Sequence, residues 1–165
     1  MQVRELAFKE TVIGLVAVVL FVSPAAAEIR GEPTIIDGDS LEVEGYRFNL
    51  FGIDSPEPGT ICWKENGDSF DCGRIATTAL LDLTAGLEVV CTPLDQANPD
   101  ETGIVPATCT AGGFSLNRNM VHTGWAIADR AATDAYVSTE TEAKTAKRGL
   151  WRWSWKVQPP WPSMP

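Results

Sequence analysis

Four carboxylates lie close together in the sequence, and side chains of this type can share one chemical task. Asp37 and Asp39 stand at the start of one apolar run, Asp54 ends the next run, and Glu57 follows soon after it. Carboxylates gathered in a dry pocket repel one another, and a hard cation such as Ca²⁺ or Mg²⁺ binds carboxylate and carbonyl oxygens. The spacing therefore suggests a cation site. The alternative is a set of separately solvated turn carboxylates.

The two apolar runs, residues 35–43 and 46–53, alternate as the strands of a β-hairpin. A two-residue turn at Glu44-Gly45 joins them. The register gives a buried face of Leu41, Val43, Tyr46, Phe48 and Leu50, and it pairs Glu42 with Arg47 and Ser40 with Asn49 on the other face. The strand carrying the first two aspartates then lies beside the strand that delivers the third. A shared ion is therefore geometrically reasonable.

The rest of the sequence predicts a small α+β domain in which a barrel is combined with helices. We expect, in order, a polar loop over 59–68, a helix over 72–86, a strand over 87–92, a loop over 95–102, a strand over 104–110, a short helix over 115–124 and a final helix over 133–149. Pro106 suggests that the strand over 104–110 is an edge strand or contains a bulge. Thr133 or Asp134 is the expected cap of the final helix.

Residues 1–27 have the features of an export signal. A 12-residue apolar run, "TVIGLVAVVLFV", precedes the small residues Ala25 and Ala27 and is short for a membrane span. We therefore expect a mature protein that begins near Glu28, is periplasmic or secreted, and has no transmembrane span. An uncleaved anchor is the alternative.

The cysteines and the charge narrow the class of protein further. Cys62, Cys72, Cys91 and Cys109 predict two disulfides in an exported protein, whereas the absence of C-x-x-C and the single histidine disfavour structural zinc. Pairing Cys62 with Cys72 and Cys91 with Cys109 closes the shortest loops, although three pairings are possible. Without residues 1–27 the chain has 138 residues, 11 basic and 20 acidic, which suits one domain and disfavours tight binding to a phosphate backbone.

Several segments together resemble the staphylococcal nuclease-like (thermonuclease) family in its exported bacterial form. In order, they are "IIDGDSL", "LFGIDSPE", "CGRIA", "DETGIVPATC", "LNRNMVHTGWA" and "AKTAKRGLW". The resemblance implies an α+β fold, a five-stranded OB-fold-like β-barrel with three α-helices. It also implies Ca²⁺-dependent hydrolysis of phosphodiester bonds in DNA or RNA.

The resemblance also implies a domain division and a role for each carboxylate. Residues 28–151 would form the domain. Residues 152–165 are a Trp/Pro-rich tail, and the alternation of tryptophans with polar residues, not the resemblance, predicts that it packs on the domain; stacking of the tryptophans on bases or sugars is the alternative. Asp39 and Asp54 match metal-binding aspartates, and Ser55 matches the residue that offers its backbone carbonyl. Glu57 matches the carboxylate that orients or deprotonates the attacking water, and Asp37 a supporting acid.

Two arginines of the family pattern are replaced in this chain. One would stand five residues before the second metal aspartate, where the chain has Asn49, and the other would follow Gly103, where it has Ile104. Such guanidinium groups stabilise the negative charge that develops during phosphoryl transfer, and each is worth roughly 10³ to 10⁵ in rate. The replacements predict weak or lost hydrolysis.

Three functions remain open at this point. The first is a catalytically impaired nuclease homologue that binds single-stranded nucleic acid or a nucleotide weakly, with Ca²⁺ as its cofactor. The second is an active Ca²⁺-dependent phosphodiesterase in which Arg47 supplies the missing positive charge beside the catalytic Glu57. Pairing with Glu42 is the simpler role for Arg47. The third is a purely structural periplasmic domain.

Overall fold

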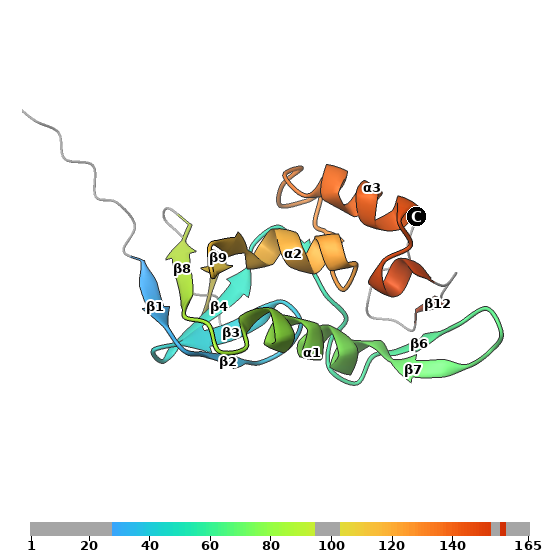
Figure 1. The fold of residues 1–165 in the computed structure, drawn as a ribbon, viewed down its shortest axis with the longest axis horizontal. Helices are drawn as coiled ribbons and strands as arrows, with labels where there is room; N and C mark the ends of the chain where they lie inside the picture. The colour runs from blue at the N-terminus through green and yellow to red at the C-terminus, as the bar shows by residue number, and fades with distance from the viewer. Residues whose placement is uncertain (1–27, 95–102, 153–155, 158–165) are drawn as a thin grey trace, which may run out of the picture.

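A computed structural model describes residues 28–94, 103–152 and 156–157 of the chain (Figure 1). The predicted export signal and the predicted loop over 95–102 lie outside these residues, as do Trp153 and Trp155. Within the described ranges, no helix has the length and apolar character that a bilayer span requires.

The described residues form a series of short strands and three α-helices, and the first seven strands all precede the first helix. The strands are β1 (Ile29–Gly31), β2 (Pro33–Ile35), β3 (Ser40–Val43), β4 (Tyr46–Leu50), β5 (Ile53–Asp54), β6 (Ile61–Trp63), β7 (Ser69–Asp71), β8 (Val89–Pro93), β9 (Ile104–Ala111), β10 (Phe114–Ser115), β11 (Ile127–Ala128) and β12 (Lys156–Val157). The helices are α1 (Cys72–Thr84), α2 (Leu116–Thr123) and α3 (Val137–Thr145), followed by the 3₁₀ turn η1 (Gly149–Arg152).

The main sheet curls into a nearly closed barrel. Its strand order is β1-β8-β9-β4-β3-β2, with β10 added to β9. β1 and β2 are two parts of one segment, residues 29–35, yet they pair with β8 and β3 at opposite ends of that order. The segment therefore joins the two edges and serves as one strand of a five-stranded barrel with β3, β4, β8 and β9. This arrangement confirms the predicted α+β, OB-fold-like barrel with three α-helices.

The predicted hairpin register is correct, with Leu41 opposite Phe48 and Glu42 opposite Arg47. Glu44 and Gly45 both have positive φ, of 52° and 81°, as a tight hairpin turn requires. The apolar residues of this hairpin lie in the barrel core, except that Tyr46 is 56% exposed. The prediction that Tyr46 is buried was wrong. Tyr46 precedes the β4–β9 ladder, which starts at Arg47, whereas Val43 opposite it also pairs with Pro33 and is fully buried.

β9 is a central strand, so the prediction of an edge strand or bulge at Pro106 was wrong. β9 lies between β8 and β4, and Pro106 pairs with Asn49 of β4 in the parallel ladder. The Pro106 carbonyl accepts a hydrogen bond from Leu94 N (3.1 Å), just beyond the end of β8. In a strand the N–H and C=O of one residue point to the same side, so the N–H that proline lacks would also have faced the end of β8 and not β4. The β4 ladder uses neighbouring groups, as when Phe51 N donates to Ala107 O (2.9 Å).

The helices begin and end largely where the sequence predicts. Asp71 caps α1 by accepting from Arg74 N, and Ser115 caps α2 in the same way. The cap prediction for the last helix was wrong, because residues 133–136 form a turn and Tyr136 precedes α3 without a side-chain cap. The predicted loop over 59–68 was also wrong in part, because it contains β6, which pairs with β7.

Both disulfides have the pairing that closes the shortest loops. Cys62–Cys72 joins β6 to the start of α1, and Cys91–Cys109 joins β8 to β9 inside the barrel. All four cysteines are fully buried, and each disulfide lies in its own apolar cluster. In Figure 1 the barrel strands occupy one side of the molecule, and the β6–β7 hairpin projects from the other.

Candidate functional site

Asp39 lies at the centre of the acidic site and is 6% exposed. Its Oδ2 accepts a hydrogen bond from Ser55 N over 2.8 Å. Its Oδ1 accepts from Asn49 Nδ2 and from Ser40 Oγ, both over 3.2 Å. These contacts join the start of β3, the outer face of β4 and the end of β5 at one buried carboxylate.

Asp37 and Gly38 form the turn that presents Asp39. Asp37 Oδ1 accepts from Asp39 N over 2.9 Å, as aspartates do in turns of this kind. A Cβ on Gly38 would lie 2.4 Å from Ser55 Oγ and 2.8 Å from Ala76 Cβ. Gly38 is therefore required by the close approach of the turn to the Ser55 segment and to α1.

The Asp54 and Glu57 segments are fixed by neighbours distant in sequence. Asp54 ends β5 and pairs with Ile127 of β11. A Cβ on Gly73, in the first turn of α1, would lie 1.9 Å from the backbone oxygen of Glu57. The same oxygen accepts from Thr60 N over 2.9 Å. The Glu57 backbone is thus held against α1, while its side chain is exposed.

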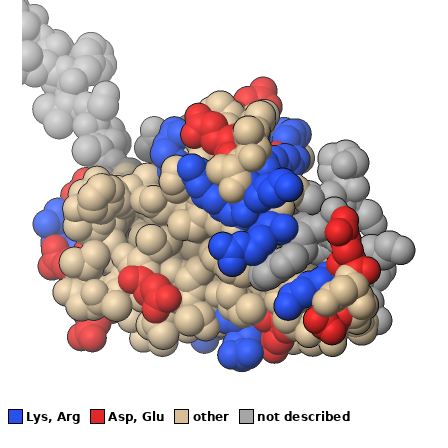
Figure 2. Space-filling model, turned by 45° about the vertical axis from the view of Figure 1, so that its right-hand side comes forward, with Lys and Arg blue, Asp and Glu red and all other residues tan. Residues whose placement is uncertain are grey.

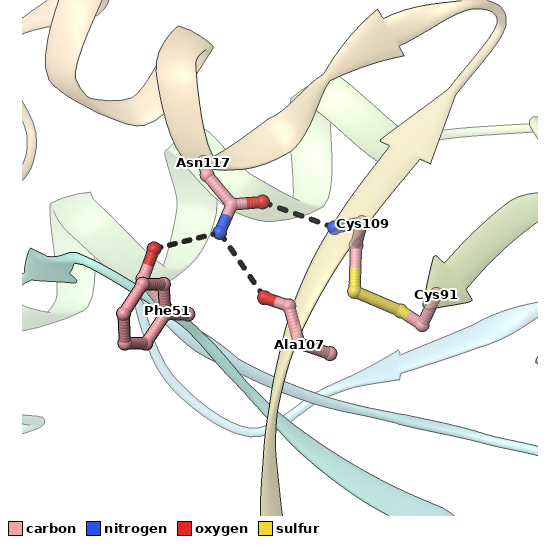
Figure 3. The surroundings of a disulfide bond; sticks show 5 residues. All are labelled: Phe51, Cys91, Ala107, Cys109 and Asn117. Atoms are coloured by element: carbon pink, nitrogen blue, oxygen red, sulfur yellow. Dashed lines mark hydrogen bonds between the residues drawn. A yellow bond between two sulfur atoms is a disulfide. The ribbon is translucent and has the colours of Figure 1, made fainter. Parts of the chain in front are cut away.

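Asn117 of α2 positions the bend between β4 and β5 (Figure 3). Its Nδ2 donates to Phe51 O (3.0 Å) and Ala107 O (3.2 Å), and its Oδ1 accepts from Cys109 N (3.0 Å). Asn117 is fully buried. Because Phe51 immediately precedes the turn into β5, this amide fixes the part of the chain that delivers Asp54.

The charges of Asp37 and Asp54 act on both Asp39 and Glu57. Burial, followed by the charge of Asp37, raises the pKa of Asp39 to about 8, against the lowering effect of the Ser55 N–H. Burial, followed by the charges of Asp37 and Asp54, raises the pKa of Glu57. The structure therefore brings the sequence-predicted acids into one electrostatic unit.

This donor set suits a hard cation in its charge and atom types. Each ionised neighbour makes the next carboxylate harder to ionise, and a divalent cation would reverse that effect. Among the described residues, however, no three Asp, Glu, His or Cys side chains converge as a metal cage. The set implied by the resemblance has only two side chains, Asp39 and Asp54, with the Ser55 carbonyl as a third donor. It therefore does not require such a cage.

Neutral side chains stand at the two positions where the resemblance implies arginines. Asn49 uses its amide on Asp39 and on Ser40 Oγ (3.4 Å). Ile104 begins β9 and pairs with Arg47 of β4. Arg47 itself is 54% exposed, and its Nε lies 3.4 Å from Glu42 Oε2. The simpler role considered for Arg47, a cross-strand ion pair, is thus present in the structure.

A cavity of about 430 Å³ lies elsewhere, between the β1–β2 segment and the end of α1. It is lined by Gly31, Glu32, Pro33, Leu81 and residues 84–88, so none of the four carboxylates contributes to it. The candidate site is defined by its charges and hydrogen bonds.

A nearly closed five-stranded barrel with three helices, and acids near its β3–β5 end, is the arrangement that the resemblance to a nuclease-like class of protein leads us to expect. The family profile described as "Staphylococcal nuclease homologue" matches residues 47–153. The chain belongs to this family. The match begins in β4 and extends beyond α3. Members of the family generally depend on Ca²⁺ and bind nucleic acid.

Two characterised relatives are similar over most of the chain. The succinoglycan biosynthesis protein ExoI of Rhizobium meliloti (strain 1021) is 34% identical over 131 residues, which cover 78% of this chain and 67% of that protein. Protein ParB of Escherichia coli is 30% identical over 165 residues, which cover 85% of this chain and 86% of that protein.

Sequence reasoning missed three residues that position the site. Ser40 donates a hydrogen bond to Asp39, and Gly73 lies against the Glu57 backbone. Asn117 fixes the bend before Asp54. Their contacts are with residues far away in the chain or depend on side-chain orientation, so no local pattern reveals them. For Asn117, the sequence offered one signal. The segment "LNRNMVHTGWA", which contains it, resembles the Asn-containing second helix of the family.

Proposed function

We propose that this protein is an exported, Ca²⁺-dependent binding module for single-stranded nucleic acid or nucleotides, with weak or lost hydrolytic activity. The observation that carries the proposal is the hydrogen bond from Asn49 Nδ2 to Asp39 Oδ1. The acidic centre is retained, while a neutral amide occupies the position of a transition-state arginine.

In the proposed site, Asp39 and Asp54 would hold Ca²⁺ with the backbone carbonyl of Ser55. The bound ion would supply positive charge that attracts a phosphate oxygen of the ligand. Hydrogen bonds from Ser55 N and Asn49 orient Asp39 before any ion binds. Glu57, on the exposed side of the site, would orient a water molecule toward the phosphate.

Weak hydrolysis follows from the side chains that face the developing charge. A carboxamide is a neutral donor, and the amide of Asn49 is already engaged by Asp39 and Ser40. Ile104 offers no side-chain donor. Losing two guanidinium groups removes stabilisation that the reaction needs in its transition state but that ligand binding does not need to the same degree.

A second candidate function is an active phosphodiesterase in which Arg47 acts as the substitute cation. Arg47 and Asn49 lie on the same face of β4, and the ion pair of Arg47 with Glu42 is half exposed. Exposed ion pairs contribute little to stability, so Arg47 is able to leave its partner. The proposal of weak hydrolysis is preferred, because the structure has Arg47 beside Glu42, and the second candidate needs this side chain to move from there to the acidic site.

Export is supported by the two disulfides, which persist mainly in oxidising compartments outside the cytoplasm. We propose that residues 1–27 are the signal that directs it, that residues 28–151 act as the domain, and that the segment 152–165 packs against it. Pairing of β12 with β6 supports the last point.

Thermal unfolding with Ca²⁺ or EDTA tests the binding module. Ca²⁺ is expected to raise the Tm of the wild type and to tighten its binding to a labelled single-stranded oligonucleotide. Asp39→Ala should abolish both effects, whereas Asp68→Ala, in the exposed β6–β7 turn, should preserve them. A wild type that responds to Ca²⁺ in neither assay would refute the proposal.

A further inference from the structure

The charges of this acidic protein are segregated along the chain. Residues 28–117 contain four basic and 16 acidic residues, whereas residues 118–165 contain seven basic and four acidic residues. Figure 2 shows Lys and Arg side chains gathered around α3 on one face of the molecule. The net charge of -9 therefore conceals a surface of the opposite sign.

The boundary between α2 and α3 carries two guanidinium groups in fixed positions. Arg118 Nη1 donates to Thr139 Oγ1 over 2.8 Å, and its guanidinium lies 5.8 Å from the Tyr136 ring centroid. Arg148 Nη1 lies 3.2 Å from His122 Nδ1. Because Arg118 and His122 are one turn apart on α2, these contacts hold the two arginines along the same helix boundary.

The other side of α3 has two cations around one buried carboxylate. Glu140 is 1% exposed and pairs with Arg130 and with Lys144 (3.2 Å). Lys144 Nζ also lies 4.4 Å from the Trp151 ring centroid. One negative charge is thus matched by two positive charges, and the surplus is positive.

We group these residues with Lys147 and Arg152, their neighbours in sequence, and call the set the basic face: Arg118, Arg130, Lys144, Lys147, Arg148 and Arg152. Arg118, Arg130, Lys147 and Arg152 are exposed, and the other two are half-buried. The elements of this face adjoin those of the acidic site. β11, which precedes Arg130, pairs with β5, and β12, which follows η1, pairs with β6 beyond the Glu57 loop.

We propose that the basic face binds the phosphodiester backbone of single-stranded nucleic acid, as a contact surface separate from the acidic site. This inference rests on the proposed function and adds a second surface to it. Guanidinium groups bind phosphate oxygens through paired N–H donors, and four of the six residues are arginines. Ligand attraction to this face would offset the repulsion between the phosphates and the acidic barrel.

A membrane surface fits the described residues less well. A membrane-binding face presents large apolar side chains beside its cations. The large exposed apolar side chains of the described residues are Ile36, Tyr46, Leu81, Leu87 and Phe114. They belong to the barrel, α1 and β10, whereas α3 and η1 contribute none of them.

Fluorescence anisotropy with a labelled single-stranded oligothymidylate, in EDTA, tests this surface without the Ca²⁺-dependent site. The double substitution Lys147→Glu with Arg148→Glu removes two cations of the basic face. Arg30→Glu with Arg74→Glu is the matched control, because it changes the net charge equally at exposed positions on β1 and α1. Circular dichroism and Tm verify that each variant is folded.

The basic-face variant is expected to bind at least about tenfold more weakly than the wild type, while the control binds nearly as well. The dependence of log K on log salt should also become shallower by about 1.4, since each single-strand phosphate contact contributes ~0.7. Equal weakening in both variants, or no binding by the wild type in EDTA, would overturn the proposal. Tighter binding to phosphatidylglycerol vesicles or to an acidic polysaccharide would overturn the choice of partner.

These outcomes are independent of the Ca²⁺ test. If the Tm response to Ca²⁺ is absent but binding in EDTA depends on Lys147 and Arg148, the acidic-site proposal fails and the basic face stands. If Ca²⁺ stabilises the protein but binding ignores these two residues, the basic-face proposal fails alone.

Discussion

Asn49 donates a hydrogen bond from its side-chain amide to Oδ1 of Asp39 over 3.2 Å. The contact links the position of a family arginine to the position of the first metal-binding aspartate. A guanidinium there would bring positive charge, whereas the amide brings none. Burial and the Asp37 charge keep the pKa of Asp39 at about 8. Under the proposed function, the site thus has the acids that would attract a cation but a neutral group where charge would develop in hydrolysis.

Asp39 should make metal-free stability depend on pH. Its pKa rises from 3.8 to about 8 on folding, so the folded state binds the proton more tightly. The stabilising contribution is complete below pH 3.8 and is lost as the pH rises to about 8, with a slope of at most ~1.4 kcal/mol per pH unit. Asp39→Asn should gain stability relative to the wild type over this range, measured by urea unfolding in EDTA. A constant difference between the two proteins would show that this ionisation is not linked to folding.

Gly73→Ala should displace the Glu57 loop and destabilise the fold by about 1–3 kcal/mol, the usual cost of overpacking. The new Cβ would stand 1.9 Å from the Glu57 backbone oxygen, which also accepts a hydrogen bond from Thr60 N. Gly31→Ala is the matched control, since its Cβ would meet only the flexible end of Glu44 at 2.6 Å. Its effect should stay within about 0.5 kcal/mol in the same chemical denaturation experiment. Equal effects would mean that this contact does not constrain the loop.

Asn117→Ala should cost about 2–4 kcal/mol of unfolding free energy, because three backbone groups, two of them at buried contacts, each lose a hydrogen bond to this amide. The control is Asn119→Ala on the same helix, where the side chain bonds only to Ser115 O one turn away. That change should cost less than about 1 kcal/mol. A small effect at Asn117, similar to the control, would contradict its role in fixing the bend before β5.

Glu140→Gln should weaken the packing of α3 by removing the charge shared by Arg130 and Lys144. The buried carboxylate loses its charge, whereas Arg130 and Lys144 stay partly exposed to water, so the expected cost is that of hydrogen bonds to a charged group, about 1.5–3 kcal/mol. Glu142→Gln, at an exposed position on the same helix, should cost less than about 0.5 kcal/mol. Thermal unfolding of both variants measures the difference. A Glu140→Gln protein as stable as the wild type would contradict this role of Glu140.

The hairpin that carries the acids was predictable because local patterns agree. Alternation of apolar residues and a two-residue turn with positive φ fix the same register, and Leu41 opposite Phe48 follows from it. Tyr46 fits the alternation but lies before the start of the β4–β9 ladder and is exposed, although Val43 opposite it is buried. Periodicity predicts the face on which a side chain lies but not the extent of the core.

The contacts that assemble the site were mostly beyond prediction. The closest approaches join Gly38 to Ser55 and Gly73 to Glu57, and such pairs leave no periodic trace in the sequence. β6 was missed because its short run lies among polar residues, and its pairing with β7 depends on the hairpin as a whole. The identities of the acids, by contrast, were available from their motif, because the chemistry depends on residue type.

Cleavage of a labelled single-stranded oligonucleotide in Ca²⁺ tests most directly whether the neutral residues Asn49 and Ile104 limit hydrolysis. The rate of the wild type is compared with that of Asn49→Arg with Ile104→Arg, and each is repeated with Glu57→Gln. Asn49→Gln with Ile104→Gln controls for side-chain size without charge. We expect slow cleavage by the wild type and by the glutamine control. The arginine variant should cleave at least roughly 10²-fold faster, and Glu57→Gln should abolish this gain. Wild-type cleavage as fast as that of the arginine variant, and abolished by Glu57→Gln, would contradict this expectation.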